Sequence, residues 1–82
     1  MVSYGDTLGT SWVQISNDED YILQNKSTDG TKVVVKVSAS EPTDTVGAFE
    51  LNGGDVVAST VLNGVVWARA VGTGLATIAY AK

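Results

Sequence analysis

Residues 32–38 read Lys-Val-Val-Val-Lys-Val-Ser, and this stretch decides the fold class. Successive side chains of an extended strand point to opposite faces, which places Val33, Val35 and Val37 together. The other face then carries Lys32, Val34, Lys36 and Ser38. A period of two with one wet face is typical of an antiparallel strand that is buried on one side. The stretch therefore predicts a β-strand at 32–38.

Six further segments of the same kind lie on either side of this strand. Each is short, rich in strand-forming residues and bounded by turn residues. We place them at about 11–16, 21–25, 48–51, 56–62, 65–71 and 75–80. No stretch has the 3.6-residue apolar period of an amphipathic helix. The chain is therefore predicted to be all-β: a small antiparallel β-sandwich or barrel of about seven short strands, with no helix.

Turn residues between these segments predict how the strands connect. Ser-Thr-Asp-Gly at 27–30 is a hairpin signal, because Asp-Gly supplies the positive φ that tight turns require. Residues 39–46 hold the single Pro, Pro42, and we expect this loop to carry the chain from one sheet to the other. An antiparallel meander in the C-terminal half is favoured by three Gly-marked turns, at 52–54, 63–64 and 72–74.

The size of the chain bounds its stability. A domain of 82 residues buries about 60% of the surface that its unfolded form exposes, so its core contributes modestly. The sequence contains no Cys and no His, which excludes disulfides and a structural zinc site as further support. Contacts with other chains remain, so we expect oligomerisation or docking on a larger surface. We divide the chain into an N-terminal arm at 1–10, which gains order on docking, and a single β domain at 11–82.

Composition also excludes several functions. Catalytic sites draw first on His, Cys and paired carboxylates, and Asp44 and Asp55 are better read as loop residues, so we predict no enzyme, no catalytic residue and no cofactor. The acidic run Asp18-Glu19-Asp20 lacks the spacing of a calcium loop, so we predict no metal site. The net charge of −4 and five scattered cations argue against nucleic acid. The chain has no apolar run of about 20 residues and no secretion signal, so we predict no membrane partner.

Four residues are candidates for contact with a partner: Trp12, Val34, Trp67 and Arg69. The runs at 33–35 and 65–71 are apolar on both faces, which implies that something covers their outer face. Each Trp is expected to anchor the core or a subunit interface, although an exposed Trp could instead stack on a sugar ring. Arg69, the only Arg, either meets a carboxylate of Glu50 or of a neighbouring subunit, or lays its stem along the sheet with its head in water.

Several short segments occur in a characteristic order: the strand at Trp12, Leu-Gln-Asn-Lys-Ser at 23–27, Ala-Ser-Glu-Pro-Thr at 39–43, Gly47 with Phe49 and Leu51, and Val-Trp-Ala-Arg-Ala at 66–70. This order resembles that of small proteins encoded among the structural genes of tailed bacteriophages. The resemblance runs from about Trp12 to Tyr80, and none of its motifs is catalytic. The chain departs from lambda-type decoration proteins in lacking their Pro-rich N-terminal arm.

The resemblance implies a non-enzymatic virion protein, made in the host cytoplasm. The position we expect is that of a capsid decoration, or cement, protein that stabilises neighbouring copies of the major coat protein. Such proteins commonly form trimers, so a homo-oligomer, with a trimer favoured, is also implied. The alternative is a tail- or fibre-associated module in which Trp67 or Tyr80 stacks on a host glycan or receptor.

Overall fold

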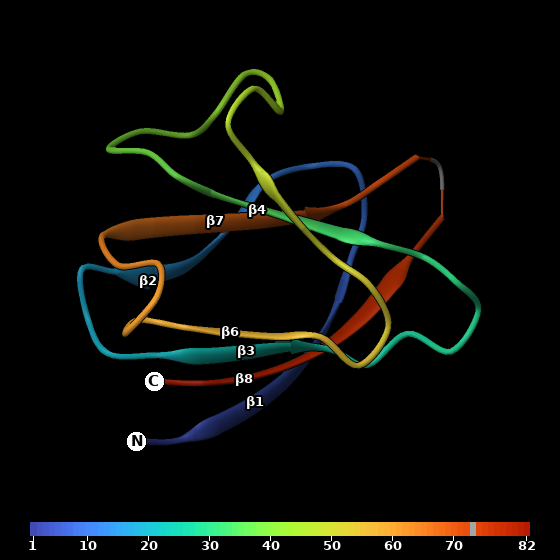
Figure 1. Cartoon of the computed structure of the whole chain (residues 1–82), viewed down its shortest axis with the longest axis horizontal. Coiled ribbons are helices and arrows are strands. Elements are labelled where there is room, and N and C mark those ends of the chain that lie inside the picture. The colour runs from blue at the N-terminus through green and yellow to red at the C-terminus, as the bar shows by residue number, and fades with distance from the viewer. Residues whose placement is uncertain (73) are drawn as a thin grey trace.

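The computed structural model describes residues 1–72 and 74–82, which form eight strands and no helix. The strands are β1 (Ser3–Leu8), β2 (Val13–Asn17), β3 (Ile22–Asn25), β4 (Val33–Val37), β5 (Phe49–Leu51), β6 (Val56–Ala58), β7 (Val65–Ala70) and β8 (Ala76–Ala81). They pair antiparallel in two four-stranded sheets, ordered β1-β8-β3-β6 and β2-β7-β4-β5. The two sheets lie one above the other (Figure 1). The prediction of a small all-β sandwich is confirmed.

Each of the seven expected segments overlaps one strand of the structure, from β2 to β8, and β2 and β8 each extend one residue further, to Asn17 and Ala81. The largest difference is at 56–62, where β6 ends at Ala58. The chain turns there because the amides of Val61 and Leu62 both donate to the carbonyl of Ala58. The expected turn at 72–74 includes Thr73, which lies outside the described residues.

The N-terminal segment corrects the division of the chain. Residues 1–10 are not a free arm, because Ser3–Leu8 forms β1 and pairs with β8 over its whole length, from Ser3 opposite Ala81 to Leu8 opposite Ala76. Leu8 is fully buried in the core, and the Tyr4 ring stacks on Tyr80 with 5.2 Å between ring centroids. The sequence did not predict this strand, because Leu8 is its only core residue and the segment therefore shows no alternation of apolar and polar residues. The backbone of β8 supplies the hydrogen bonds that hold it.

The connections also differ from those expected. The turn at 27–30 joins β3 to β4, which lie in different sheets, so it does not close a hairpin. The loop at 39–46 joins β4 to β5 within one sheet. No C-terminal meander forms, because β5, β6, β7 and β8 alternate between the two sheets. Positive φ at Gly54 and Gly64, of 92° and 120°, lets the chain reverse sharply. That conformation does not decide which sheet the chain enters next.

The core lies between the sheets and is built from alternating positions of the strands. Val33 and Val35 are fully buried, as the period of two predicts. Val66, Ala68 and Ala70 contribute the matching face of β7. The remaining core residues are Leu8, Ile15, Tyr21, Leu23, Leu51, Ala76 and Ile78.

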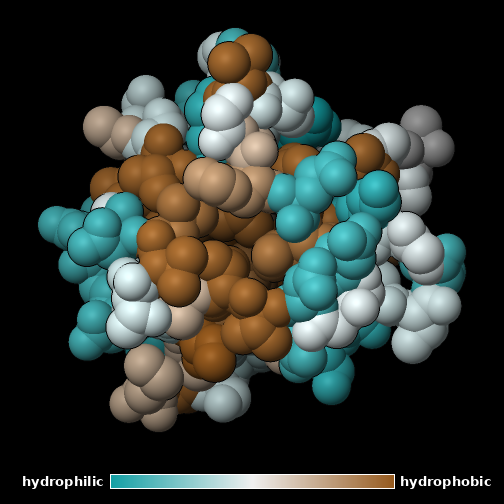
Figure 2. Space-filling model, viewed as in Figure 1, coloured by the Kyte–Doolittle hydropathy of each residue, from teal (hydrophilic) through white to brown (hydrophobic). Residues whose placement is uncertain are grey.

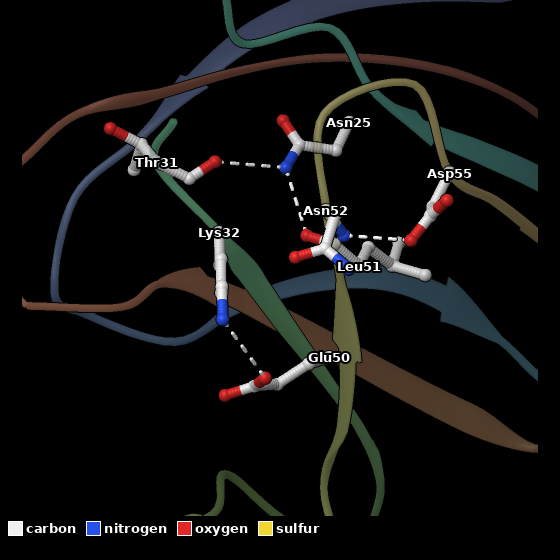
Figure 3. Close-up of polar contacts among 7 residues, drawn as sticks. All are labelled: Asn25, Thr31, Lys32, Glu50, Leu51, Asn52 and Asp55. Atoms are coloured by element: carbon white, nitrogen blue, oxygen red, sulfur yellow. Dashed lines mark hydrogen bonds and ion pairs between the residues drawn. The ribbon is translucent and has the colours of Figure 1, made fainter. Parts of the chain in front are cut away.

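One polar side chain in the core connects the two sheets. Asn25, at the end of β3, is fully buried and its Nδ2 donates to the carbonyls of Thr31 (3.0 Å) and Leu51 (2.9 Å). Its Oδ1 accepts from the amide of Ser27 (3.0 Å). Figure 3 shows the side chain between the segment before β4 and the end of β5. Because Leu51 belongs to the opposite sheet, Asn25 ties the two layers together at this end of the sandwich.

Candidate interaction surface

The four residues predicted to make contacts lie together on one surface. Val34 in β4 is directly opposite Arg69 in β7, so the two side chains share a face. Trp67 is two residues before Arg69 in the same strand and points the same way. The ring centroid of Trp12, just before β2, is 5.3 Å from Cζ of Arg69. We call this outer surface of the β2-β7-β4-β5 sheet the tryptophan face.

Val34 shows how the tryptophan face is covered. It points away from the core, yet only 5% of its surface is exposed. Its neighbours in register are Arg69 on one side and Glu50 on the other, and both have long side chains. The chain therefore shields Val34 itself. The inference that another molecule must cover this apolar position is wrong.

Both tryptophans are half-buried, and neither belongs to the core. The indole N–H of Trp67 donates to the carbonyl of Ser38 (2.9 Å), which fixes the ring over the end of β4. Its neighbours across the sheet are Gln14 in β2 and Lys36 in β4. Part of each ring remains open to solvent, so the two residues form an apolar platform on the sheet.

Arg69 lies on this platform without an acidic partner. Its Nη1 donates to the carbonyl of Thr10 (3.3 Å), and its guanidinium lies over the Trp12 ring in a cation–π contact. Glu50, the carboxylate expected to meet it, lies 3.7 Å from Nζ of Lys32 instead (Figure 3). Nε of Arg69 is buried with no hydrogen-bond partner among the described residues. No described carboxylate is within 4.0 Å of the Arg69 guanidinium.

The other cations of the tryptophan face are neutralised within the chain. Lys36 Nζ is 2.8 Å from Oδ1 of Asp44, which lies in the loop between β4 and β5. The hydrogen bond from Lys36, followed by one from the amide of Val46, lowers the pKa of Asp44 below its usual value. Lys32 is paired with Glu50. Arg69 is therefore the cation on this face that remains open to an external carboxylate.

The outer surface of the β1-β8-β3-β6 sheet differs from the tryptophan face in the charge of its side chains. Its outward positions form three rows across the strands: Ser3, Ala81, Ile22 and Ala58; Gly5, Ala79, Gln24 and Val56; Thr7 and Thr77. None of these ten strand residues carries a charge, but the exposed Lys26, just beyond β3, continues the third row: its amide donates to the carbonyl of Thr77 (2.8 Å). Ile22 and Val56 are 45% and 51% exposed. We call this surface of the β1-β8-β3-β6 sheet the neutral face.

A shallow hollow of about 180 Å³ lies on the neutral face. It is lined by Ser3, Ile22, Gln24, Val56, Ala79, Tyr80 and Ala81. The sequence analysis did not single out this surface, although one signal was present. The alternate positions of 3–7, 22–24, 56–58 and 77–81 are all uncharged. Without the pairing of the strands, nothing indicated that these positions share one face.

A second apolar region lies at the edge formed by β5 and β6. Phe49 is opposite Val35, so it points between the sheets, yet it is 58% exposed. Val37, two residues beyond Val35 on the same face, is 40% exposed. Strands β5 and β6 have three residues each and leave this side of the core partly open. Figure 2 shows apolar atoms gathered in the band between the two sheets.

Other chemistry is sparse in residues 1–72 and 74–82. These residues contain no group of three or more metal-ligating side chains. Asp18 adopts a positive φ of 61° in the turn after β2, and there the Ser16 hydroxyl donates to the Glu19 carbonyl (2.9 Å). Within the same residues, no helix is long and apolar enough to cross a membrane.

Comparison of the chain with known protein families, curated proteins and solved structures finds no match. The assignment of function therefore rests on the surfaces described above and on the resemblance carried by the short segments.

Proposed function

We propose that this chain is a non-enzymatic structural protein that acts by docking on other protein subunits through the tryptophan face. In its specific form, the proposal is a capsid decoration protein of a tailed bacteriophage, found in the virion after synthesis in the host cytoplasm. The observation that carries the docking role is the clustering of Trp12, Trp67 and Arg69 on one exposed sheet surface. The resemblance carries the placement in a virion.

The composition and rigidity of the tryptophan face favour a protein partner. Trp and Arg are the residues most enriched among those that dominate binding energy at protein interfaces. Trp67 is held by its hydrogen bond to Ser38, and Arg69 by Thr10 and Trp12, so little side-chain freedom is lost on docking. Arg69 then offers a guanidinium edge to an acidic side chain of the partner, and we expect that side chain to come from the major coat protein.

A decoration protein with this surface would act by repetition. Each copy would bury part of two neighbouring coat subunits, and many copies together would raise the heat or internal pressure that the shell withstands. Interfaces that bury about 1,600 Å² in total are typical of specific complexes. The whole domain exposes 4575 Å², so half of such an interface would take a substantial part of its surface. Homo-oligomers, with the trimer that the resemblance implies, would bring several such surfaces to one site on the shell.

The copy number in purified particles tests the virion role. Quantitative mass spectrometry of particles from the virus that encodes the chain should find hundreds of copies per particle if the protein decorates the shell. A dozen or fewer would place it in the tail or collar and would overturn the decoration role. Absence from the particles would overturn the virion proposal as a whole.

Matched variants test the surface. Arg69→Ala and Trp12→Ala should each reduce incorporation into particles at least tenfold, because each removes part of the same anchor. Ser40→Ala, at an exposed position in the loop after β4, should leave incorporation unchanged. Circular dichroism establishes that the variants fold. Folded Arg69→Ala protein that is incorporated normally would exclude the tryptophan face as the docking surface.

Carbohydrate binding is the second candidate, because two half-exposed Trp rings on a flat sheet also suit stacking on sugars. Tyr80 fits that role poorly, since it stacks on Tyr4 and packs against the core. A glycan array separates the two functions. If Trp67→Ala abolished binding to an arrayed glycan and left particle incorporation unchanged, the module would be a glycan binder.

A further inference from the structure

We infer that the neutral face is a self-association surface, on which a second copy of this chain docks face to face about a two-fold axis. This inference does not rest on docking through the tryptophan face, which lies on the opposite side of the sandwich, but it expects a dimer in place of the trimer that the resemblance implies. It starts from the contrast between the two outer surfaces. One carries Lys32, Lys36 and Arg69 among its strands, whereas the ten outward strand positions of the other carry no charge and its one lysine, Lys26, lies beyond the end of β3.

Charge is the first argument for a second copy as the occupant. The chain has nine acidic and five basic residues and a net charge of −4, so two copies repel one another on average. The two rows at the centre of the neutral face carry no charge, so a contact through them desolvates no ion, while Lys26 lies at the margin beside Thr77. The uncharged centre of the face is electrostatically complementary to itself. It offers nothing specific to a strongly charged partner.

The shape of the neutral face is the second argument for a second copy as the occupant. On β1 and β8 the outward side chains are small: Ser3, Gly5, Ala79 and Ala81. On β3 and β6 they include Ile22 and Val56, which are among the exposed large apolar residues. A two-fold axis parallel to the strands lays β3 and β6 of one copy over β8 and β1 of the other. The larger side chains of each copy then meet the small ones of its partner, beside the hollow on this face.

The size of the neutral face limits the strength of the contact. Four strands spaced about 4.8 Å apart, with about five residues at 3.4 Å each, cover a few hundred Å² per copy. A stable dimer typically buries about 800 Å² per partner. We therefore expect a monomer–dimer equilibrium that depends on concentration, with a dissociation constant in the micromolar range or weaker. A face complementary to itself closes as a dimer, whereas a trimer requires contact between two different surfaces.

Sedimentation equilibrium of the purified chain, over about 5 to 500 µM, tests the contact. The expected result is a monomer–dimer equilibrium in which added salt does not weaken the dimer. Ala79→Glu places a charge at the centre of the neutral face and should weaken dimerisation at least tenfold, because two copies would bury two carboxylates near the axis. A monomer throughout this range, or a trimer, would overturn the inference.

A matched pair of substitutions controls for effects on folding. Gln24→Glu adds a charge to the neutral face, and Gln14→Glu makes the same change on the outer side of β2, in the tryptophan face. Both are outward positions of strands, and circular dichroism checks that both variants fold. Gln24→Glu should weaken the dimer, and Gln14→Glu should leave it intact. The reverse pattern would move the self-association surface to the tryptophan face and overturn the inference, while particle incorporation would test the proposed function separately.

Discussion

The buried Asn25 side chain makes three hydrogen bonds at one end of the sandwich, one of them to a strand of the opposite sheet. It satisfies two backbone carbonyls and one amide, in the turn before β4 and at the end of β5; the side chain and its bond to Leu51 are buried, and the bonds to Thr31 and Ser27 are partly buried. A buried backbone group without a partner destabilises the folded state, because it gave up its hydrogen bond to water on folding and gained none in return. One amide side chain therefore stabilises three segments at once.

Removing this amide should be costly. We expect Asn25→Ala to lower the free energy of unfolding by about 2 to 4 kcal/mol, as expected for burying unpaired polar groups. Asn25→Asp should cost more at neutral pH, because a carboxylate cannot donate to the Thr31 and Leu51 carbonyls, and part of the loss should return once the group is protonated. Urea unfolding at pH 7 and pH 4 measures both effects. Asn52→Ala, at an exposed position nearby, is the control and should change the free energy of unfolding by less than about 0.5 kcal/mol.

Because of Tyr21, we expect the stability of the folded chain to depend on pH in the alkaline range. Its hydroxyl donates to the carbonyl of Leu62, and burial raises its pKa above the ordinary value of 10.0. A pKa that is higher in the folded state means that folding favours the protonated phenol. This contribution is fully present below about pH 10, and it is lost as the pH rises through the pKa of the folded state.

Tyr21→Phe removes both the hydrogen bond and the titration. The variant should be less stable by about 1 to 2 kcal/mol at pH 7, because the Leu62 carbonyl loses its donor. Between about pH 10 and 12 its stability should fall less steeply than that of the parent chain, so the difference should narrow. Urea unfolding at intervals of pH measures the two slopes. Equal slopes would mean that Tyr21 does not titrate differently in the folded and unfolded states.

At the scale of the elements, β1 is the strand that was not predicted from the sequence. A free arm and a paired edge strand make opposite predictions for two neighbouring positions. Leu8 points into the core, so Leu8→Ala should lower the free energy of unfolding by about 2 to 4 kcal/mol. Thr7 points outward and is exposed, so Thr7→Ala should change it by less than about 0.5 kcal/mol. Thermal or urea unfolding measures both, and equal, negligible effects would indicate a free arm.

The same contrast explains what the sequence could predict. Strands β2 to β8 were predictable because strand-forming residues gather there in short runs and turn residues bound them. The tryptophan face was predictable in part, since Trp67 and Arg69 are two apart in one strand and must share a face. The presence of β1, the order of the strands and the neutral face were not predictable. Each depends on which backbone pairs with which, and local periodicity carries no information about that pairing.

At the scale of the whole molecule, almost every strand pairs with one distant in sequence. Among the strands of the described residues, only β4 and β5 are both consecutive and paired, and all other consecutive strands lie in different sheets. The two ends of the chain meet in the sheet: the amide of Val2 donates to the carbonyl of Lys82 (2.9 Å), and that of Lys82 donates to Val2 (3.1 Å). Figure 1 shows the termini side by side. Folding must therefore bring residues from opposite ends together before the β1-β8 pair forms, which makes folding slow.

Joining the two ends of the chain covalently would keep β1 and β8 close together in the unfolded state, so folding would no longer have to bring them together. An Asn-Gly linker between Lys82 and Met1 makes a three-residue loop with Met1, a length that antiparallel strands accept. Cyclisation restricts the unfolded chain, so we expect it to raise the free energy of unfolding by about 2 to 4 kcal/mol and to speed folding. The linear chain with the same two residues appended is the control. Urea unfolding and stopped-flow fluorescence of Trp12 and Trp67 measure the two effects. A cyclic chain no more stable than the control would show that the ends are not held together as the pairing of Val2 with Lys82 requires.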